Sequence, residues 1–373
     1  MQTIQPNRTF NRRDALKLAG IAGVTALGGY ALYEYAPWLN YEEVATQPRQ
    51  AFHSSELLPA PLLELVRFAS LAPSGHNTQP WKFAVKDTAI EIHPDFSRRL
   101  PAVDPHDREL WISLGCALEN LLIAARAAGY RPEVTYPDAA VSIGVALNAA
   151  TPMRTPLLSV IPERQNTRSI YNAQPLERTA LTKLQAVALE PGVTLHFQLE
   201  AAELERVLEY VSLGNQSQFA DKAFVTELLR WLRFTKKEAL ASRDGLYSGA
   251  SGNPQVPRWI GQIVVSGTKP QQQADGDAKK LRSSSGAVII ASATDTRSAW
   301  VQVGQVYQRL ALEMTALGVK SSFLNQPIEV SDLRRQFQSA MNLGAALPQL
   351  LMRYGYADPM PFSLRRPVKD MLV

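Results

Sequence analysis

The chain has 373 residues, of which 46% are hydrophobic and 20% are charged, as expected for a globular protein with one large core or two smaller ones. Its net charge is +5, but Arg8, Arg12, Arg13 and Lys17 against Asp14 place most of that excess in residues 1–17, so the clustered basic face of a nucleic-acid-binding protein is excluded. One cysteine, Cys116, and five scattered histidines exclude an intramolecular disulfide and argue against a bound transition metal.

The N-terminus resembles an export signal. The basic stretch "TFNRRDALK" is followed by residues 18–33, which carry no charge. Arg12-Arg13 resembles the twin-arginine motif, so we expect residues 1–36 to be a twin-arginine-type signal or anchor that engages the export machinery. The protein would then be periplasmic or anchored on the outer side of the cytoplasmic membrane. An amphipathic helix with a coincidental arginine pair stays an alternative.

The remaining chain predicts alternating helices and strands. A linker is expected at 37–54, and the first group of elements is a helix in 56–72, strands at "WKFAVKD" and "AIEIH", a helix at 107–129, and strands at "EVTYPD" and "VSIGVALN". The second group is strand "LLSVI", helix "ERTALTKLQAVALEPG", strand "TLHFQL", a mostly helical tract at 202–242, strand "AVIIASA", helices at 298–317 and 331–342, and strand "PQLLMRYGYA". Residues 243–285 are rich in Gly, Ser, Pro and Gln, which predicts a long mobile segment.

Two stretches suggest an internal duplication. "LLELVRFASLAPSGHNTQPWKFAV" and "LTKLQAVALEPGVTLHFQL" both run from a helix through a Pro/Gly turn into a strand, although any such unit would match comparably. The interspersed helices and strands predict an α+β fold rather than a βαβ alternation. We therefore expect a first half at 55–155 and a second half at 156–373.

The motif "SGHNTQPW" at residues 74–81 has the chemistry of a ligand loop. The backbone N–H groups of Ser74 and Gly75 can face a ligand, and Gly75 allows close approach. Asn77 and Gln79 each offer a donor and an acceptor suited to a heterocycle with ring nitrogens and carbonyls. A polar turn that caps the preceding helix is the alternative.

Two arginine motifs predict an anion site. "ERQNTRSIY" at 163–171 places Arg164 and Arg168 four residues apart with Asn166 between them, a pattern that suits phosphate. "SLRRPVKD" at 363–370 adds Arg365 and Arg366. Each motif alone also fits solvated surface arginines.

Together these motifs resemble the nitroreductase superfamily, in particular its Acg-type FMN-binding branch with two fused nitroreductase-like halves. "APSGHNTQPW" resembles the family's Ser-Pro-Ser-x-x-Asn-x-Gln-Pro-Trp pattern, "RQNTRSIY" its arginine motif, "ALEMTALGVKSSFLNQP" its late helix and strand, and "LRRPVKDML" its C-terminal basic segment. The resemblance covers most of residues 55–373. It implies an intramolecular pseudo-dimer with mixed or antiparallel sheets flanked by helices, and one FMN between the halves.

The resemblance also implies roles for individual residues. The implied FMN contacts are Ser74, Gly75, Asn77 and Gln79 from one half, and Arg164, Asn166, Arg168, Asn325, Gln326, Arg365 and Arg366 from the other. Asn166-Thr167 and Asn325-Gln326 depart from the family pattern, which affects the expected contacts to the flavin edge.

The resulting functional hypothesis is an FMN-dependent oxidoreductase that transfers hydride or electrons to a nitroaromatic, quinone-like or related small acceptor. The flavin would perform the transfer, so no indispensable protein base or nucleophile is expected. His76 could donate a proton or stabilise the turn. The alternative function is a flavin-binding or storage protein with a shielded FMN. A serine hydrolase is disfavoured because no GxSxG or SxxK arrangement occurs.

Overall fold

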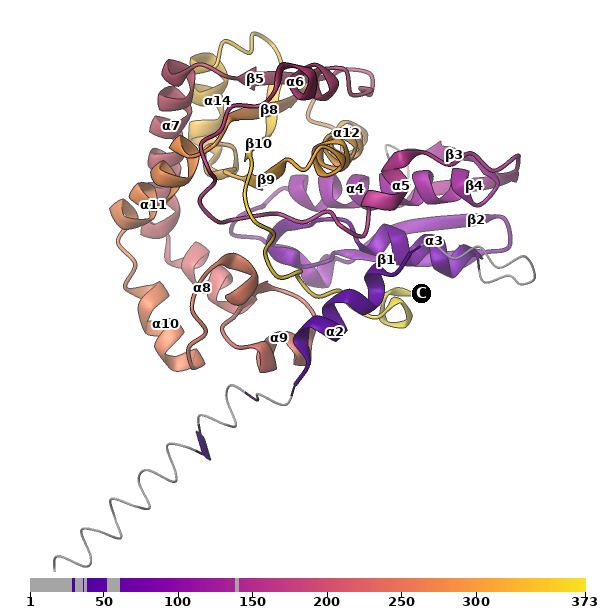
Figure 1. Cartoon of the computed structure of the whole chain (residues 1–373), viewed down its shortest axis with the longest axis horizontal. Coiled ribbons are helices and arrows are strands. Elements are labelled where there is room, and N and C mark those ends of the chain that lie inside the picture. The colour runs from indigo at the N-terminus through magenta and orange to yellow at the C-terminus, as the bar shows by residue number, and fades with distance from the viewer. Residues whose placement is uncertain (1–28, 31–35, 37–38, 52–60, 138–140) are drawn as a thin grey trace, which may run out of the picture.

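The computed structural model describes residues 29–30, 36, 39–51, 61–137 and 141–373. The export motif with Arg12 and Arg13 lies outside the described residues. Within the expected linker, helix α2 (Tyr41–Thr46) and the 3-10 turn η1 (Gln47–Arg49) lead toward the body of the protein (Figure 1).

The two halves of the chain contain the same sheet topology. The elements of the first sheet and its helices are α3 (Pro61–Ser70), β1 (Trp81–Lys86), β2 (Ala89–Pro94), α4 (Arg108–Ala127), β3 (Tyr130–Thr135) and β4 (Ile143–Ala149). Those of the second are α6 (Arg178–Gln185), β5 (Val193–Gln198), β8 (Gly286–Ser292), α12 (Arg297–Ala316), β9 (Lys320–Phe323), α13 (Gln326–Glu329), α14 (Ser331–Ala340) and β10 (Leu347–Gly355). The strand orders are β1-β2-β4-β3 and β5-β8-β10-β9, with every neighbouring pair antiparallel. In both sheets the long helix follows the second strand, which confirms the predicted α+β fold of two related halves.

The long helices α4 and α12 form the centre of the molecule. They cross where Gly115 meets Gly304, and a Cβ on Gly115 would lie 2.0 Å from the backbone oxygen of Val301. A Cβ on Gly304 would lie 2.1 Å from the oxygen of Ile112. Only glycine permits this approach, so the two halves are packed backbone against backbone. By length and composition α4 is also the one described helix that could cross a membrane, but 94% of its most apolar stretch is buried in the protein.

An insertion separates β5 from β8. The first half joins its corresponding strands, β1 and β2, by a tight turn, whereas the second half places residues 199–285 at this point. The inserted elements are α7 (Ala201–Ala220), α8 (Lys222–Trp231), β6 (Leu232–Arg233), α9 (Lys236–Ser242), β7 (Leu246–Tyr247), η4 (Gly249–Ser251), α10 (Arg258–Ser266) and α11 (Pro270–Arg282). Residues 243–285 thus contain the two helices α10 and α11. The mobility that we expect for this segment stays a prediction.

The C-terminal segment returns from the second sheet to the first. After β10 the chain passes α2, where the Tyr41 hydroxyl donates to the Phe362 carbonyl (2.8 Å), and reaches η5 (Val368–Met371). Leu372 then forms a bridge with Phe83 of β1. The two halves are therefore joined by the C-terminal segment, which runs from the second half to the first sheet, as well as by helix packing (Figure 1).

One predicted strand is wrong. "LLSVI" forms helix α5 (Pro156–Val160), which begins with proline at its first positions after the extended residue Thr155. A short apolar run does not distinguish a strand from a buried helical turn, and proline is well suited to begin a helix.

Candidate functional site

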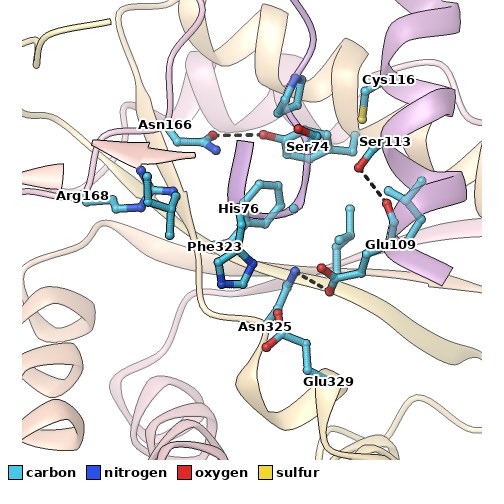
Figure 2. A pocket seen from close by; sticks show the side chains of 16 residues that line it. Ser74, His76, Glu109, Ser113, Cys116, Asn166, Arg168, Phe323, Asn325 and Glu329 are labelled. Atoms are coloured by element: carbon cyan, nitrogen blue, oxygen red, sulfur yellow. Dashed lines mark hydrogen bonds between the residues drawn. The ribbon is translucent and has the colours of Figure 1, made fainter. Parts of the chain in front are cut away.

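A cavity lies between the two halves and contains about 710 Å³ of space without atoms, part of it open to solvent. One wall comes from the loop before β1, with Ser74 and His76, and from the first turns of α4. The opposite wall comes from Asn166 and Arg168, α12, β9 and α13 (Figure 2). Leu246 of the insertion lines it as well.

Five of the residues predicted to contact a cofactor line this cavity: Ser74, Gly75, Asn166, Arg168 and Asn325. The Asn166 Oδ1 accepts a hydrogen bond from the Tyr307 hydroxyl (3.3 Å), which fixes the amide at the wall. Arg168 forms no hydrogen bond or ion pair with another described residue, and burial lowers its pKa. A half-buried guanidinium without a protein partner is suited to receive an anion.

Asn325 and Gln326 point in different directions. Asn325 Nδ2 donates to Glu109 Oε1 (3.2 Å) at the cavity, and its Oδ1 accepts from the Leu351 backbone N–H (2.9 Å). Gln326 does not line the cavity, because its Nε2 donates to Asp277 Oδ2 (3.1 Å) between the inserted helices. Of these two residues, only Asn325 lies at the cavity wall.

The loop that carries Ser74 has an unusual backbone. His76, Asn77 and Gln79 have φ values of 47°, 54° and 52°, in the left-handed region that non-glycine residues seldom adopt. Gly75 is not among the positive-φ residues, although a Cβ there would lie 3.2 Å from Leu100 Cδ1. The loop is therefore held in its shape by its surroundings rather than by glycine flexibility.

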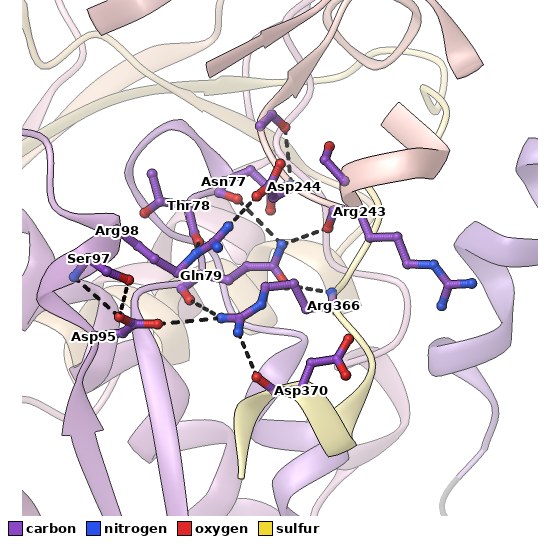
Figure 3. A network of polar contacts seen from close by, with 12 residues as sticks. Asn77, Thr78, Gln79, Asp95, Ser97, Arg98, Arg243, Asp244, Arg366 and Asp370 are labelled. Carbon is purple, nitrogen blue, oxygen red and sulfur yellow. Dashed lines mark hydrogen bonds and ion pairs between the residues drawn. The ribbon is translucent and has the colours of Figure 1, made fainter. Parts of the chain in front are cut away.

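Asn77 and Gln79 supply that support and do not line the cavity. Asn77 Nδ2 donates to the carbonyls of Gly245 (3.1 Å) and Leu364 (3.3 Å). Gln79 Nε2 donates to the Arg243 carbonyl (2.9 Å) (Figure 3). Both amides therefore join the loop to the insertion and to the C-terminal segment. In this structure both amides hold the loop to distant segments of the chain. This role differs from both the ligand contact and the simple polar turn considered above.

Arg365 and Arg366 clamp the same loop from the C-terminal side. Arg365 donates from Nη1 to Asn77 Oδ1 (3.0 Å) and from Nη2 to the carbonyls of Leu71 and Ala72 (3.1 Å each). Arg366 donates from its backbone N–H to Gln79 Oε1 (2.8 Å) and from Nη1 to the Gln79 carbonyl (3.2 Å). Neither arginine lines the cavity.

Arg365 belongs to a buried cluster of three arginines with Arg49 and Arg164. Their exposed fractions are 5%, 8% and 3%, respectively. Arg49 donates to the Pro162 carbonyl (2.6 Å) and Arg164 to the Leu71 carbonyl (3.2 Å), but Nε of all three and Nη1 of Arg164 have no partner. Burial, followed by mutual repulsion, lowers the pKa of Arg49 and lowers that of Arg365 to about 9. The described residues provide no carboxylate ion pair to this cluster.

The cluster is close to the cavity. Leu71, whose carbonyl accepts from both Arg164 and Arg365, lies two residues before Pro73 at the cavity wall. Arg164 also interacts with Tyr307 and with the Cys116 thiol, both of which line the cavity. Buried positive charge without an acidic partner is costly, so this end of the cavity is suited to an anion.

Two carboxyl groups line the opposite end of the cavity. Glu109 Oε1 accepts from Arg108 Nη2 (3.1 Å), and Glu329 Oε2 accepts from Gln218 Nε2 (2.5 Å). Burial raises the pKa of both carboxyl groups, and repulsion by Glu329 adds to this effect at Glu109. The pair is therefore suited to bind a proton next to the cavity more readily than free carboxylates do.

The sequence motifs did not indicate this carboxyl pair. Glu109 directly precedes the apolar run "LWISLGCALENLL". A carboxylate on the buried face of a predicted helix was the one sequence feature that could have indicated its role. Glu329 is far away in the sequence and comes from the short helix α13. Their proximity depends on the packing of the two halves.

Neither His76 nor Cys116 is charged at neutral pH. Burial, and then the nearby Arg168, lowers the pKa of His76 to about 4, so the imidazole is neutral. Burial raises the pKa of the Cys116 thiol, which disfavours the reactive thiolate. Proton donation by His76 at neutral pH is therefore disfavoured relative to donation by the carboxyl pair.

The geometry defines a class of protein: an α+β chain of two related halves, with a cavity between them that carries cationic groups at one end and a proton-holding carboxyl pair at the other. No family model matches the chain. It is 27% identical over 321 residues to a Mycobacterium tuberculosis protein with the provisional name NAD(P)H nitroreductase Rv3131, covering 83% of this chain and 90% of that protein. The provisionally named NAD(P)H nitroreductase acg of the same species is 23% identical, with 82% and 93% covered.

The similarity to solved structures is weaker. A provisionally named nitroreductase from Anabaena variabilis aligns with a TM-score of 0.42 and 10% identity, covering 84% of this chain and 92% of that chain. A nitroreductase from Bacteroides fragilis with bound FMN aligns with a TM-score of 0.33 and 13% identity, covering 55% and 90%. By sequence, the chain is thus similar over most of its length to provisionally named nitroreductases, Acg among them.

Proposed function

We propose that this chain binds FMN in the cavity between its halves and acts as a nitroreductase-type oxidoreductase that passes electrons from NAD(P)H to a small acceptor. The observation that carries the proposal is the positive charge without acidic partners at one end of the cavity, formed by Arg168 at the wall and by the buried cluster of Arg49, Arg164 and Arg365 behind it. The motif resemblance and the names of the relatives agree with this chemistry.

The residues at the cavity fit the chemical groups of FMN. Arg168 has no hydrogen-bond or ion-pair partner among the described residues, so it is available to hold the dianionic phosphate, with the charge of the buried cluster adding to the local potential. Asn166 and Ser74 offer polar groups for hydroxyls of the ribityl chain, and Asn325 offers an amide for a heterocycle edge. When bound, FMN would supply the hydride or electron transfer.

The protein would contribute orientation and a proton. Reduction of a quinone or nitro group by hydride requires a proton as well, and the raised pKa values of Glu109 and Glu329 suit this pair to supply one at the cavity wall. His76 is neutral and can accept or donate a hydrogen bond without adding charge. The acceptor would be small because the same cavity has to accommodate both it and the cofactor.

The test is an anaerobic rapid-mixing experiment on the purified full-length chain loaded with FMN. NADPH or NADH should bleach the flavin absorbance, and a nitroaromatic or quinone added afterwards should restore it. A chain that stays yellow but is not bleached by either nicotinamide would support the storage alternative instead. Failure to bind FMN at all would reject both functions.

A further inference from the structure

Helix α10 exposes an apolar face at one end of the molecule. The side chains of Trp259, Ile263 and Val264 are 57%, 66% and 61% exposed. On its other side, Gly261 packs on Phe234 so closely that a Cβ would lie 2.2 Å from the ring. Because Gly261 is about half a turn from Trp259 and Ile263, these two residues point away from the body.

Single exposed apolar residues are common on protein surfaces, but three within six positions of one helix form a patch. The surrounding sequence "RWIGQIVVSGTK" at 258–269 contains Arg258 and Lys269 and no acidic residue. An exposed tryptophan beside aliphatic residues, flanked by basic residues, is typical of a helix that lies in the interface of a membrane.

The position of the patch agrees with the route of the N-terminal chain. Arg258 Nε donates to Glu238 Oε1 of α9 (2.9 Å), and Lys236 of α9 donates from Nζ to the Leu39 carbonyl (3.0 Å). The first continuous described stretch therefore starts beside α9 and α10, and α2, α9 and α10 lie at the same end of the molecule (Figure 1). The uncharged stretch 18–33 precedes it by only a few residues.

We propose that the exposed face of α10, formed by Trp259, Ile263 and Val264, lies in the headgroup region of a lipid bilayer that contains anionic lipids. Lys269, just after the helix, favours an anionic surface, whereas Arg258 is already paired with Glu238. A membrane anchor in the N-terminal segment, as expected from the sequence, would hold this end of the molecule at the same membrane. This inference concerns a surface remote in sequence from the cavity and does not depend on flavin binding.

The test measures the fluorescence of Trp259 in the full-length chain mixed with vesicles of phosphatidylcholine and phosphatidylglycerol in equal parts, with bromine on the acyl chains. Brominated lipid should quench a fraction of the emission that is absent in Trp259→Phe, and the difference between the two proteins isolates Trp259 from the other five tryptophans. Reading this tryptophan separates α10 from any binding by the N-terminal segment.

Ile263→Glu provides the loss-of-function variant and Leu189→Glu the control. Leu189 is 46% exposed and lies between α6 and β5, at the end of the molecule opposite α10 (Figure 1). Removing one buried apolar side chain from the interface should weaken the Trp259-dependent binding about tenfold in Ile263→Glu, whereas Leu189→Glu should bind like the wild type. Circular dichroism melting verifies that both variants fold.

The proposal is overturned if the chain binds vesicles with no quenching that depends on Trp259. It is also overturned if Ile263→Glu leaves quenching intact. A dimer in solution that Ile263→Glu abolishes, without Trp259-dependent quenching, would assign the face to a second copy of the chain instead.

Discussion

Arg365 Nη1 donates to Asn77 Oδ1 at 3.0 Å, joining two residues 288 positions apart in the sequence. Asn77 in turn holds Gly245 of the insertion. Three distant segments therefore meet at one buried amide, immediately behind the loop that lines the cavity. The shape of the cavity wall and the stability of the fold depend on the same hydrogen bonds.

We predict that Arg365→Gln reduces both stability and FMN binding. The substitution leaves the carbonyls of Leu71 and Ala72 and the Asn77 amide without their buried donor, which should cost roughly 3 kcal/mol. Denaturant unfolding of the apoprotein measures the first effect, and FMN titration the second. An apoprotein as stable as the wild type would show that the clamp is unimportant.

Arg168→Gln should separate binding from stability. Arg168 has no hydrogen bond or ion pair with another described residue, so its loss removes no internal contact, while it removes the expected phosphate partner at the cavity. We expect at least a tenfold weaker FMN affinity, a loss of about 1.4 kcal/mol, with an unchanged apoprotein melting temperature. Unchanged FMN affinity would remove Arg168 from the proposed site.

Gly115→Ala should strongly destabilise the protein. The new Cβ would lie 2.0 Å from the Val301 oxygen at the crossing of α4 and α12, so the helices must separate, at a cost of about 3 kcal/mol. Gly276→Ala in α11 is the matched control, because a Cβ there meets no atom within 4 Å and alanine favours helix. Thermal unfolding that ranks the two variants equally would contradict the packing.

Glu109→Gln should change how stability depends on pH. Burial, and then repulsion by Glu329, raises the folded-state pKa of Glu109 above 4.5, so the folded protein binds more protons than the unfolded chain above that pH. Wild-type stability should therefore fall as pH rises from about 4.5 toward the raised pKa, and the variant should lose less over the same range. Urea unfolding across this range tests it, and identical slopes would argue against the proton-holding pair.

The fold could be predicted from the sequence more completely than the site could. The run at 107–129 has a clear helical pattern and a glycine after its end, and it forms α4 at Arg108–Ala127 as expected. The strand prediction for "LLSVI" is wrong because a five-residue run with four apolar residues carries no decisive period, whereas Pro156 begins a helix.

At the site, the sequence indicated which residue types lie near the cavity, but it did not indicate the direction in which their side chains point. Asn77 and Gln79 were expected to face a ligand, yet their amides are occupied by carbonyls of Gly245 and Arg243, more than 160 positions away in the sequence. The Glu109–Glu329 pair was missed for the same reason. Contacts between remote segments follow from packing of the two halves, which local patterns do not encode.

Comparison of FMN with riboflavin tests most directly whether the cavity recognises a flavin through its phosphate. We expect the purified apoprotein to bind FMN at least about 100-fold more tightly than riboflavin, because riboflavin lacks the dianion that Arg168 and the buried arginine cluster would attract. Equal affinities for the two flavins, or no binding of either, would contradict it.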